Sequence, residues 1–157
     1  MYRIMFVCHG NICRSPMAEF ILKDMIKDRA DADCFTIQSS ATSTEEIWGG
    51  RGNPVYPPAK RELAAHGISC EGKRAVQLRA DDYDKYDLFA VMDSANYRNA
   101  KRILNGDPKD KVKKLMSFTN RGGDVSDPWY TGDFAGVYRD IVEGCKAVLD
   151  LIDKGEL

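Results

Sequence analysis

The chain has 157 residues, which is long enough to bury a hydrophobic core and within the usual size of one domain. Hydrophobic residues make up 43% of the sequence and charged residues 30%, without low-complexity tracts or repeats, so we expect one domain over residues 1–157. The net charge of −1 argues against nucleic acid or an anionic membrane as a partner. Any affinity for phosphate must therefore come from a local site.

No apolar run in the sequence approaches the length of a membrane span or of a signal-peptide core. The five cysteines cannot all pair with one another, and their irregular spacing does not indicate a disulfide framework. Free cysteines are typical of a reducing compartment, so we expect a cytoplasmic protein without a membrane partner.

The first predicted element is a buried strand at residues 4–7, an apolar run that leads into the turn-forming residues Gly10 and Asn11. A helix follows, because Ser15 is a good N-cap, Pro16 suits the first helical position, and apolar residues then recur with helical spacing. These residues are predicted to form a strand, a loop and a helix in succession.

Strands and helices alternate along the rest of the chain. Further strands are predicted at residues 35–40, 88–92 and 112–118, and further helices at residues 58–66, 94–104 and 134–153. Such alternation favours an α/β fold with a parallel sheet covered by helices on both faces, in which ligands bind at the carboxyl ends of the strands. The loop after the first strand lies at such an end.

The segment from Cys8 to Ser15 has the pattern of a phosphate-binding loop, with a cysteine, five residues, an arginine and a serine between a strand and a helix. The backbone N–H groups of such a loop can point to one centre, and the start of the helix adds positive potential. Glycine and asparagine tolerate the positive φ angles that the loop needs. We therefore expect phosphate to bind to the loop residues His9, Gly10, Asn11, Ile12, Cys13 and Arg14.

Cys8, Arg14 and Ser15 are the candidate catalytic residues of this loop. The positive environment favours the thiolate of Cys8, which is then a nucleophile close to the bound phosphorus. The planar guanidinium of Arg14 matches two phosphoryl oxygens, a geometry that lysine lacks. Ser15 can donate its hydroxyl to the sulfur in addition to capping the helix.

Two other interpretations of the loop cysteines remain. Cys8 can be a small buried residue at the end of a strand, which is the common fate of a free cysteine. Alternatively, Cys8 and Cys13 can be zinc ligands, although His9 and His66 are the only histidines and no second cysteine pair has ligand spacing. We expect neither a metal nor a cofactor.

The segment VCHGNICRSPMAE, together with the later DPWY segment, closely resembles the signature of the low-molecular-weight protein tyrosine phosphatases. The resemblance covers essentially the whole chain and includes Trp48, the strand order and the length. It implies a four-stranded parallel sheet, a metal-free reaction, a phosphocysteine intermediate, and tyrosine-phosphorylated proteins or peptides as substrates. It also implies that Cys8 is the nucleophile, Arg14 the phosphate clamp, Asn11 the residue that shapes the loop, and Ser15 the partner of the thiolate.

Asp127 matches the general acid of the family. A phenolate leaving group needs a proton, which a carboxylic acid can supply, and the resulting carboxylate can take a proton from the water that cleaves the intermediate. Pro128 biases Asp127 toward an extended backbone and stiffens the loop that presents it. From the residues alone, an ordinary turn is the preferred interpretation of this pair.

Ile12, Trp48, Trp129 and Tyr130 are the candidate walls of a cleft for an aromatic ring. Tyr130 and Trp48 match aromatic positions of the family, whereas Trp129 stands where some relatives have tyrosine. Core packing is the alternative role for Trp48.

Cys13 is similar to the second cysteine with which family members form a reversible disulfide to the nucleophile. The resemblance therefore implies redox regulation through Cys8 and Cys13, because such a bond shields the nucleophile from irreversible oxidation. The alternative is a packed small residue on the loop.

Three other functions compete with a tyrosine phosphatase. Thioredoxin-coupled arsenate reductases share the fold and the loop, but they use two further cysteines after the third strand region, and residues 79–97 contain none. Protein arginine phosphatases typically have threonine at the place of Ile12, whose apolar side chain packs on a ring and offers no hydrogen bond to a guanidinium. A non-catalytic phosphate-binding module would not need Asp127.

Overall fold

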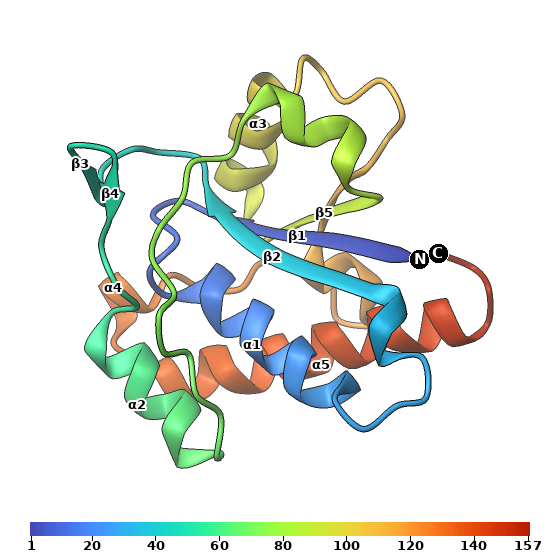
Figure 1. Cartoon of the computed structure of the whole chain (residues 1–157), viewed down its shortest axis with the longest axis horizontal. Coiled ribbons are helices and arrows are strands. Elements are labelled where there is room, and N and C mark those ends of the chain that lie inside the picture. The colour runs from blue at the N-terminus through green and yellow to red at the C-terminus, as the bar shows by residue number, and fades with distance from the viewer.

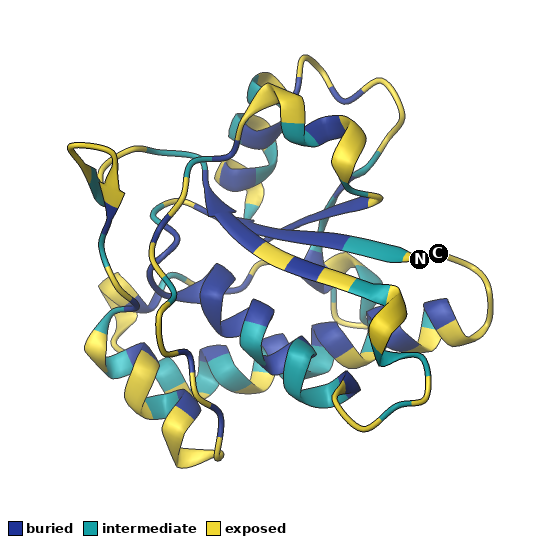
Figure 2. Cartoon of the chain, viewed as in Figure 1, coloured by how far each residue is buried: buried dark blue, intermediate teal, exposed yellow.

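The computed structural model describes residues 1–157, and its centre is a parallel sheet of four strands in the order β2-β1-β5-β6 (Figure 1). β1 spans Tyr2–Cys8, β2 Phe35–Ala41, β5 Leu88–Val91 and β6 Val112–Lys114. β1 is paired on both sides, with β2 and with β5, and helices cover both faces of the sheet. The second half of β1 is therefore completely buried, as Figure 2 shows.

The helices divide between the two faces of the sheet (Figure 1). α1 (Arg14–Ile26), α2 (Pro57–Ala65) and α5 (Phe134–Asp153) lie on one side, and α3 (Ser94–Ile103) lies on the other. Side chains of β1 alternate between two hydrophobic cores, with Phe6 in the core of α1 and α5, and Val7 in the core of α3. This sandwich fixes the end of β1 in the middle of the molecule.

The remaining elements are short. The 3₁₀ helices are η1 (Ala32–Cys34), η2 (Ala80–Lys85) and η3 (Leu115–Phe118), and α4 spans Pro128–Thr131. A hairpin of β3 (Ile47–Trp48) and β4 (Arg51–Gly52) projects beyond the end of the sheet and is largely exposed (Figures 1 and 2). None of the helices combines the length and the apolar composition that crossing a bilayer requires.

The predicted α/β fold with a four-stranded parallel sheet is confirmed, whereas the predicted last strand is too long. The strand ends at Lys114, and the chain turns into η3 at Leu115. Leu115 is completely buried against Gly144 of α5, where an added Cβ would lie 2.5 Å from the Leu115 Cγ. Packing on a helix distant in the sequence thus ends the strand at a point that local propensity does not reveal.

Candidate active site

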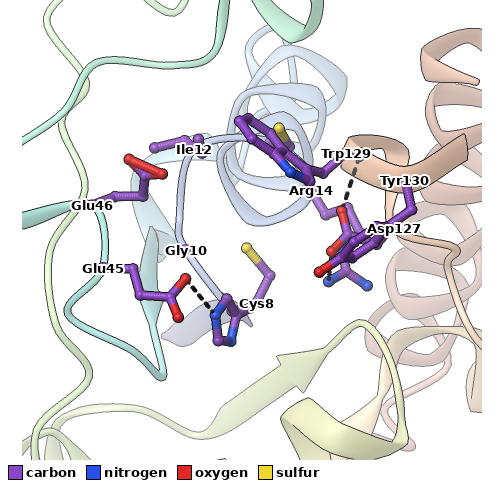
Figure 3. Close-up of a pocket in the computed structure, with 11 residues that line it drawn as sticks. Cys8, Gly10, Ile12, Arg14, Glu45, Glu46, Asp127, Trp129 and Tyr130 are labelled. Atoms are coloured by element: carbon purple, nitrogen blue, oxygen red, sulfur yellow. Dashed lines mark hydrogen bonds and ion pairs between the residues drawn. The ribbon is translucent and has the colours of Figure 1, made fainter. Parts of the chain in front are cut away.

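Cys8 is the last residue of the central strand, and the loop that follows it leads directly into α1 at Arg14. Its side chain is almost completely buried but lines a cleft at the carboxyl end of the sheet (Figure 3). The sulfur is 2.9 Å from the Ser15 Oγ and accepts a hydrogen bond of 3.3 Å from the backbone N–H of Asn11. Two donors around one sulfur stabilise negative charge on it.

Asn11 holds the loop in its curled shape. It has a positive φ of 59°, a conformation that asparagine adopts more readily than most residues. Its Nδ2 donates to the Ser15 Oγ at 2.8 Å and to the Ser39 Oγ at 3.0 Å, and its Oδ1 accepts from the Val76 N–H at 3.0 Å. Because Nδ2 donates to the Ser15 Oγ, the Ser15 hydroxyl has its own proton for the Cys8 sulfur at 2.9 Å or for the Ser40 carbonyl at 3.5 Å, and the shorter contact is the one to the sulfur.

Arg14 is 2% exposed, and its orientation is fixed by protein acceptors. Its Nη1 donates to the Asp93 Oδ2 at 2.7 Å and to the Val125 carbonyl at 2.9 Å, which leaves Nε and Nη2 for a ligand in the cleft. Burial lowers the pKa of the guanidinium, but the negative charge at Cys8 and the hydrogen bond to Asp93 outweigh burial, and the net pKa is raised. The cation therefore persists in the buried site.

Asp127 lies beside Arg14 in the cleft (Figure 3). Its Oδ2 is 3.5 Å from the Arg14 Nη2, and its Oδ1 accepts a hydrogen bond of 3.1 Å from the Trp129 N–H at the start of α4. Its backbone is extended, as expected before Pro128. The hydrogen bond to the Trp129 N–H holds the carboxyl group next to the loop. Asp127 is 113 positions after Arg14 in the sequence.

The cleft has a volume of about 430 Å³ and brings together most of the predicted site residues. Its lining comprises Cys8, His9, Gly10, Ile12, Cys13, Arg14, Glu45, Glu46, Asp127, Trp129 and Tyr130. Trp129 packs on Tyr56, with the ring centroids 4.9 Å apart, whereas Tyr130 is largely exposed. Ile12 and these aromatic side chains can flank a planar ring that enters toward Cys8.

Trp48 does not line the cleft, in contrast to its predicted role. It lies in the β3–β4 hairpin, opposite Arg51, and is 74% exposed, which also excludes the alternative of core packing. The hairpin carries this side chain beyond the end of the sheet. The residues just before the hairpin, Glu45 and Glu46, line the cleft instead, and no motif in the sequence marks them.

A buried carboxylate behind the loop was also missed. Glu19 is 2% exposed and accepts hydrogen bonds from the Ser39 Oγ at 2.5 Å and from the Lys23 Nζ at 2.6 Å. Lys73 lies 3.3 Å from it and donates to the Ser39 carbonyl at 3.0 Å. Glu19 thereby supports Ser39, which in turn accepts from Asn11. Glu19 follows Ser15 by four residues, so the two side chains lie on the same buried face of α1. This spacing is the sequence signal that indicates Glu19.

Cys13 is a second buried thiol in the lining of the cleft. Burial, together with the negative charges of Cys8 and Asp127, raises its pKa to about 12. It is therefore a neutral thiol at physiological pH, and the five cysteines of the chain are all free in the structure. No group of three or more histidine, cysteine or acidic residues lies close enough together to hold a metal ion.

Comparisons with known proteins agree with this geometry. The chain is 36% identical to a low molecular weight protein-tyrosine-phosphatase, PtpA of Staphylococcus aureus (strain MRSA252), over 98% of this chain and 96% of the relative. The crystal structure of YfkJ from Bacillus subtilis is similar with a TM-score of 0.92 and 31% identity, covering 100% of this chain and 98% of that chain.

The crystal structure of SP-PTP, a low molecular weight protein tyrosine phosphatase from Streptococcus pyogenes, has a TM-score of 0.83 and 34% identity, covering 96% of this chain and 92% of that chain. The family described as low molecular weight phosphotyrosine protein phosphatase matches residues 3–156. The cysteine loop, the buried arginine and the neighbouring aspartate thus lie in a chain that belongs to the low-molecular-weight phosphotyrosine protein phosphatase family.

Proposed function

We propose that this chain hydrolyses phosphotyrosine in proteins, with Cys8 as the nucleophile, Arg14 as the phosphate clamp and Asp127 as the general acid and base. The observation that carries the proposal is the placement of these three groups around one cleft, with Ser15 hydrogen-bonded to the sulfur. Membership of the family supports the same reaction.

In the first step, the Cys8 thiolate attacks the phosphorus, so that an S–P bond forms and the P–O bond to the tyrosine ring breaks. The loop N–H groups and the Nε and Nη2 of Arg14 bind the phosphoryl oxygens as charge develops on them, with Nη2 also 3.5 Å from the Asp127 Oδ2. Asp127 gives its proton to the phenolate oxygen, which leaves as a neutral phenol.

In the second step, water attacks the phosphorus of the phosphocysteine. Asp127, now a carboxylate, takes a proton from that water, the S–P bond breaks and inorganic phosphate is released. The electron pair returns to the sulfur of Cys8, where the Ser15 hydroxyl and the Asn11 N–H stabilise the thiolate. The cycle needs water only, and the enzyme is regenerated.

The shape of the cleft supports tyrosine as the phosphorylated residue. The side chain of Ile12 and the ring of Trp129 can contact an aromatic ring. Neither of these two side chains accepts a hydrogen bond from a phosphoarginine guanidinium, so the acceptors for that group in the cleft wall are the carboxylates of Glu45 and Glu46. Protein arginine phosphatase activity is the main alternative, and peptides with phosphotyrosine, phosphoarginine or phosphoserine separate the two when their rates of hydrolysis are compared.

We further propose that Cys8 and Cys13 form a reversible disulfide under oxidation, because both thiols line the same cleft. Peroxide treatment followed by mass spectrometry should detect this bond, and thiol should reverse it. Irreversible sulfonic acid at Cys8 as the only product would contradict the idea. A thiolate nucleophile requires a reducing environment, which supports a cytoplasmic location with phosphoproteins as the partners.

The mechanism is tested with phenyl phosphate in the presence of a chelator. We expect turnover by the unmodified chain, no turnover by Cys8→Ser, and a strongly reduced rate for Asp127→Ala, because the phenolate then leaves without a proton. Normal turnover by Cys8→Ser would refute Cys8 as the nucleophile. Trapping of phosphate on Cys8, detected by mass spectrometry after rapid quenching, checks the intermediate directly.

A further inference from the structure

We propose that Glu45 and Glu46 make this enzyme prefer phosphotyrosines that are flanked by lysine or arginine in the substrate. The inference rests on the proposed function, because it concerns the residues on either side of the phosphotyrosine. It assigns a role to two side chains of the cleft that the chemistry of phosphoryl transfer does not use.

The two glutamates form a wall opposite the aromatic side chains of the cleft. Figure 3 shows Glu45 and Glu46 on one side of Cys8, and Trp129 and Tyr130 on the other. The glutamates come from the segment between β2 and the hairpin, which approaches the loop because β2 ends beside β1. A phosphotyrosine that enters the cleft therefore brings its neighbouring residues close to both walls.

Both carboxylates are held in place by neighbouring groups. The Glu46 Oε2 accepts a hydrogen bond of 2.7 Å from the Asn53 Nδ2, and the Glu46 carbonyl accepts one of 2.8 Å from the Asn53 N–H. Its Cγ lies directly over the loop, 3.3 Å from the position of a Cβ added to Gly10. The Glu45 Oε2 is 2.9 Å from the His9 Nε2, and the Glu45 side chain is 70% exposed. Positioned carboxylates lose little entropy when they bind a cation.

The outer part of the cleft has no lysine or arginine that would balance these carboxylates, and His9, which lines it, contacts only the Glu45 carboxylate. Arg14 is buried at the bottom and bound to Asp93, with its free donors directed to the phosphate, and no lysine lines the cleft. Arg51, the cation of the hairpin, lies opposite Trp48 and outside the lining. The site thus combines a cationic base for the phosphate with an anionic rim for the flanking residues.

The sign of this rim decides which flanking residues bind well. An exposed ion pair changes an equilibrium by up to roughly fivefold, and a like-charge contact has a similar effect in the opposite direction. A lysine beside the phosphotyrosine is attracted by the carboxylates of Glu45 and Glu46, whereas a glutamate at the same place is repelled by them. We therefore expect about a tenfold difference in kcat/KM between otherwise identical basic and acidic peptides at low salt.

The test compares two phosphotyrosine peptides that differ only in having lysine or glutamate at the two positions on each side. Phosphate release is measured for the unmodified chain, for Glu45→Gln, Glu46→Gln and the double variant. Glu71→Gln is the matched control, because Glu71 is a comparably exposed glutamate that pairs with Lys60 outside the cleft. Phenyl phosphate, which has no flanking residues, is measured in parallel.

We expect the unmodified chain and Glu71→Gln to prefer the lysine peptide by about tenfold, and the double variant to lose most of this preference. High salt should weaken the preference in the unmodified chain, because it screens exposed charges. The inference would be overturned if kcat/KM for the lysine and glutamate peptides differed by less than about twofold in the unmodified chain. It would also be overturned if the double variant kept the full preference for the lysine peptide. Hydrolysis of phenyl phosphate without any flank preference refutes the inference alone, whereas no hydrolysis of phenyl phosphate refutes the proposed function.

Discussion

Replacement of Arg14 by lysine tests whether the geometry of the guanidinium, rather than its charge alone, stabilises the transition state. Both Nη1 hydrogens bind protein acceptors, so Nε and Nη2 are the donors that remain for two phosphoryl oxygens. A lysine keeps the charge but restores at most one of these contacts, and its ammonium is also attracted to Asp93. A hydrogen bond to a charged group contributes about 1.5–3 kcal/mol. At about 1.4 kcal/mol per factor of ten, Arg14→Lys should lower kcat/KM by roughly 10- to 150-fold.

The assay is hydrolysis of phenyl phosphate, with inhibition by inorganic phosphate as a second measurement of the same contacts. Arg121→Lys is the matched control, because Arg121 pairs with Asp140 and Glu143 on the exposed surface and does not line the cleft. Thermal unfolding verifies that both variants are folded. If folded Arg14→Lys retained activity within about threefold of the unmodified chain, the fork geometry of Arg14 would have no catalytic role.

Two further predictions concern stability. Gly52→Ala places a Cβ 1.8 Å from the backbone oxygen of Ala75, so the hairpin must shift, and we expect a loss of about 1–3 kcal/mol, visible by calorimetry as a lower Tm. An unchanged Tm would contradict this contact. Arg29 donates to Asp31 and Asp153 and lowers the pKa of both carboxyl groups, so its stabilising effect is present at neutral pH and is lost as the pH falls below about 4. Arg29→Ala should therefore be less stable than the unmodified chain in urea at pH 7, with a smaller difference at pH 3.5; an equal difference at both values would refute this linkage.

The local part of the site could be predicted from the sequence. Cys8, Arg14 and Ser15 lie within eight consecutive residues that run from the last residue of a strand into the first turn of a helix, so the chain itself brings them together. The helix begins at Arg14, so Ser15 lies within its first turn and is not its N-cap. The turn-forming Asn11 indicated the curled loop, and it has the expected positive φ. Such features depend on backbone preferences over a few residues, which a sequence reveals directly.

The role of Asp127 could not be predicted from the residues that neighbour it in the sequence. From its neighbours alone it was an ordinary turn residue, and only the family resemblance indicated a role at the loop. Its position beside Arg14 depends on the packing of the segment before α5, more than one hundred residues after the loop, and no local preference encodes that approach.

Residue types and spacing were enough to predict a phosphate-binding loop, the alternation of strands and helices, and a parallel sheet with the loop at its carboxyl edge. The distant side chains around the loop follow from the packing of separate segments: Trp48 lies outside the cleft, Glu45 and Glu46 line it, and Glu19 supports it from behind. The physical reason is that a short motif sets its own backbone, whereas the walls of a cleft depend on the directions in which separate loops leave the sheet.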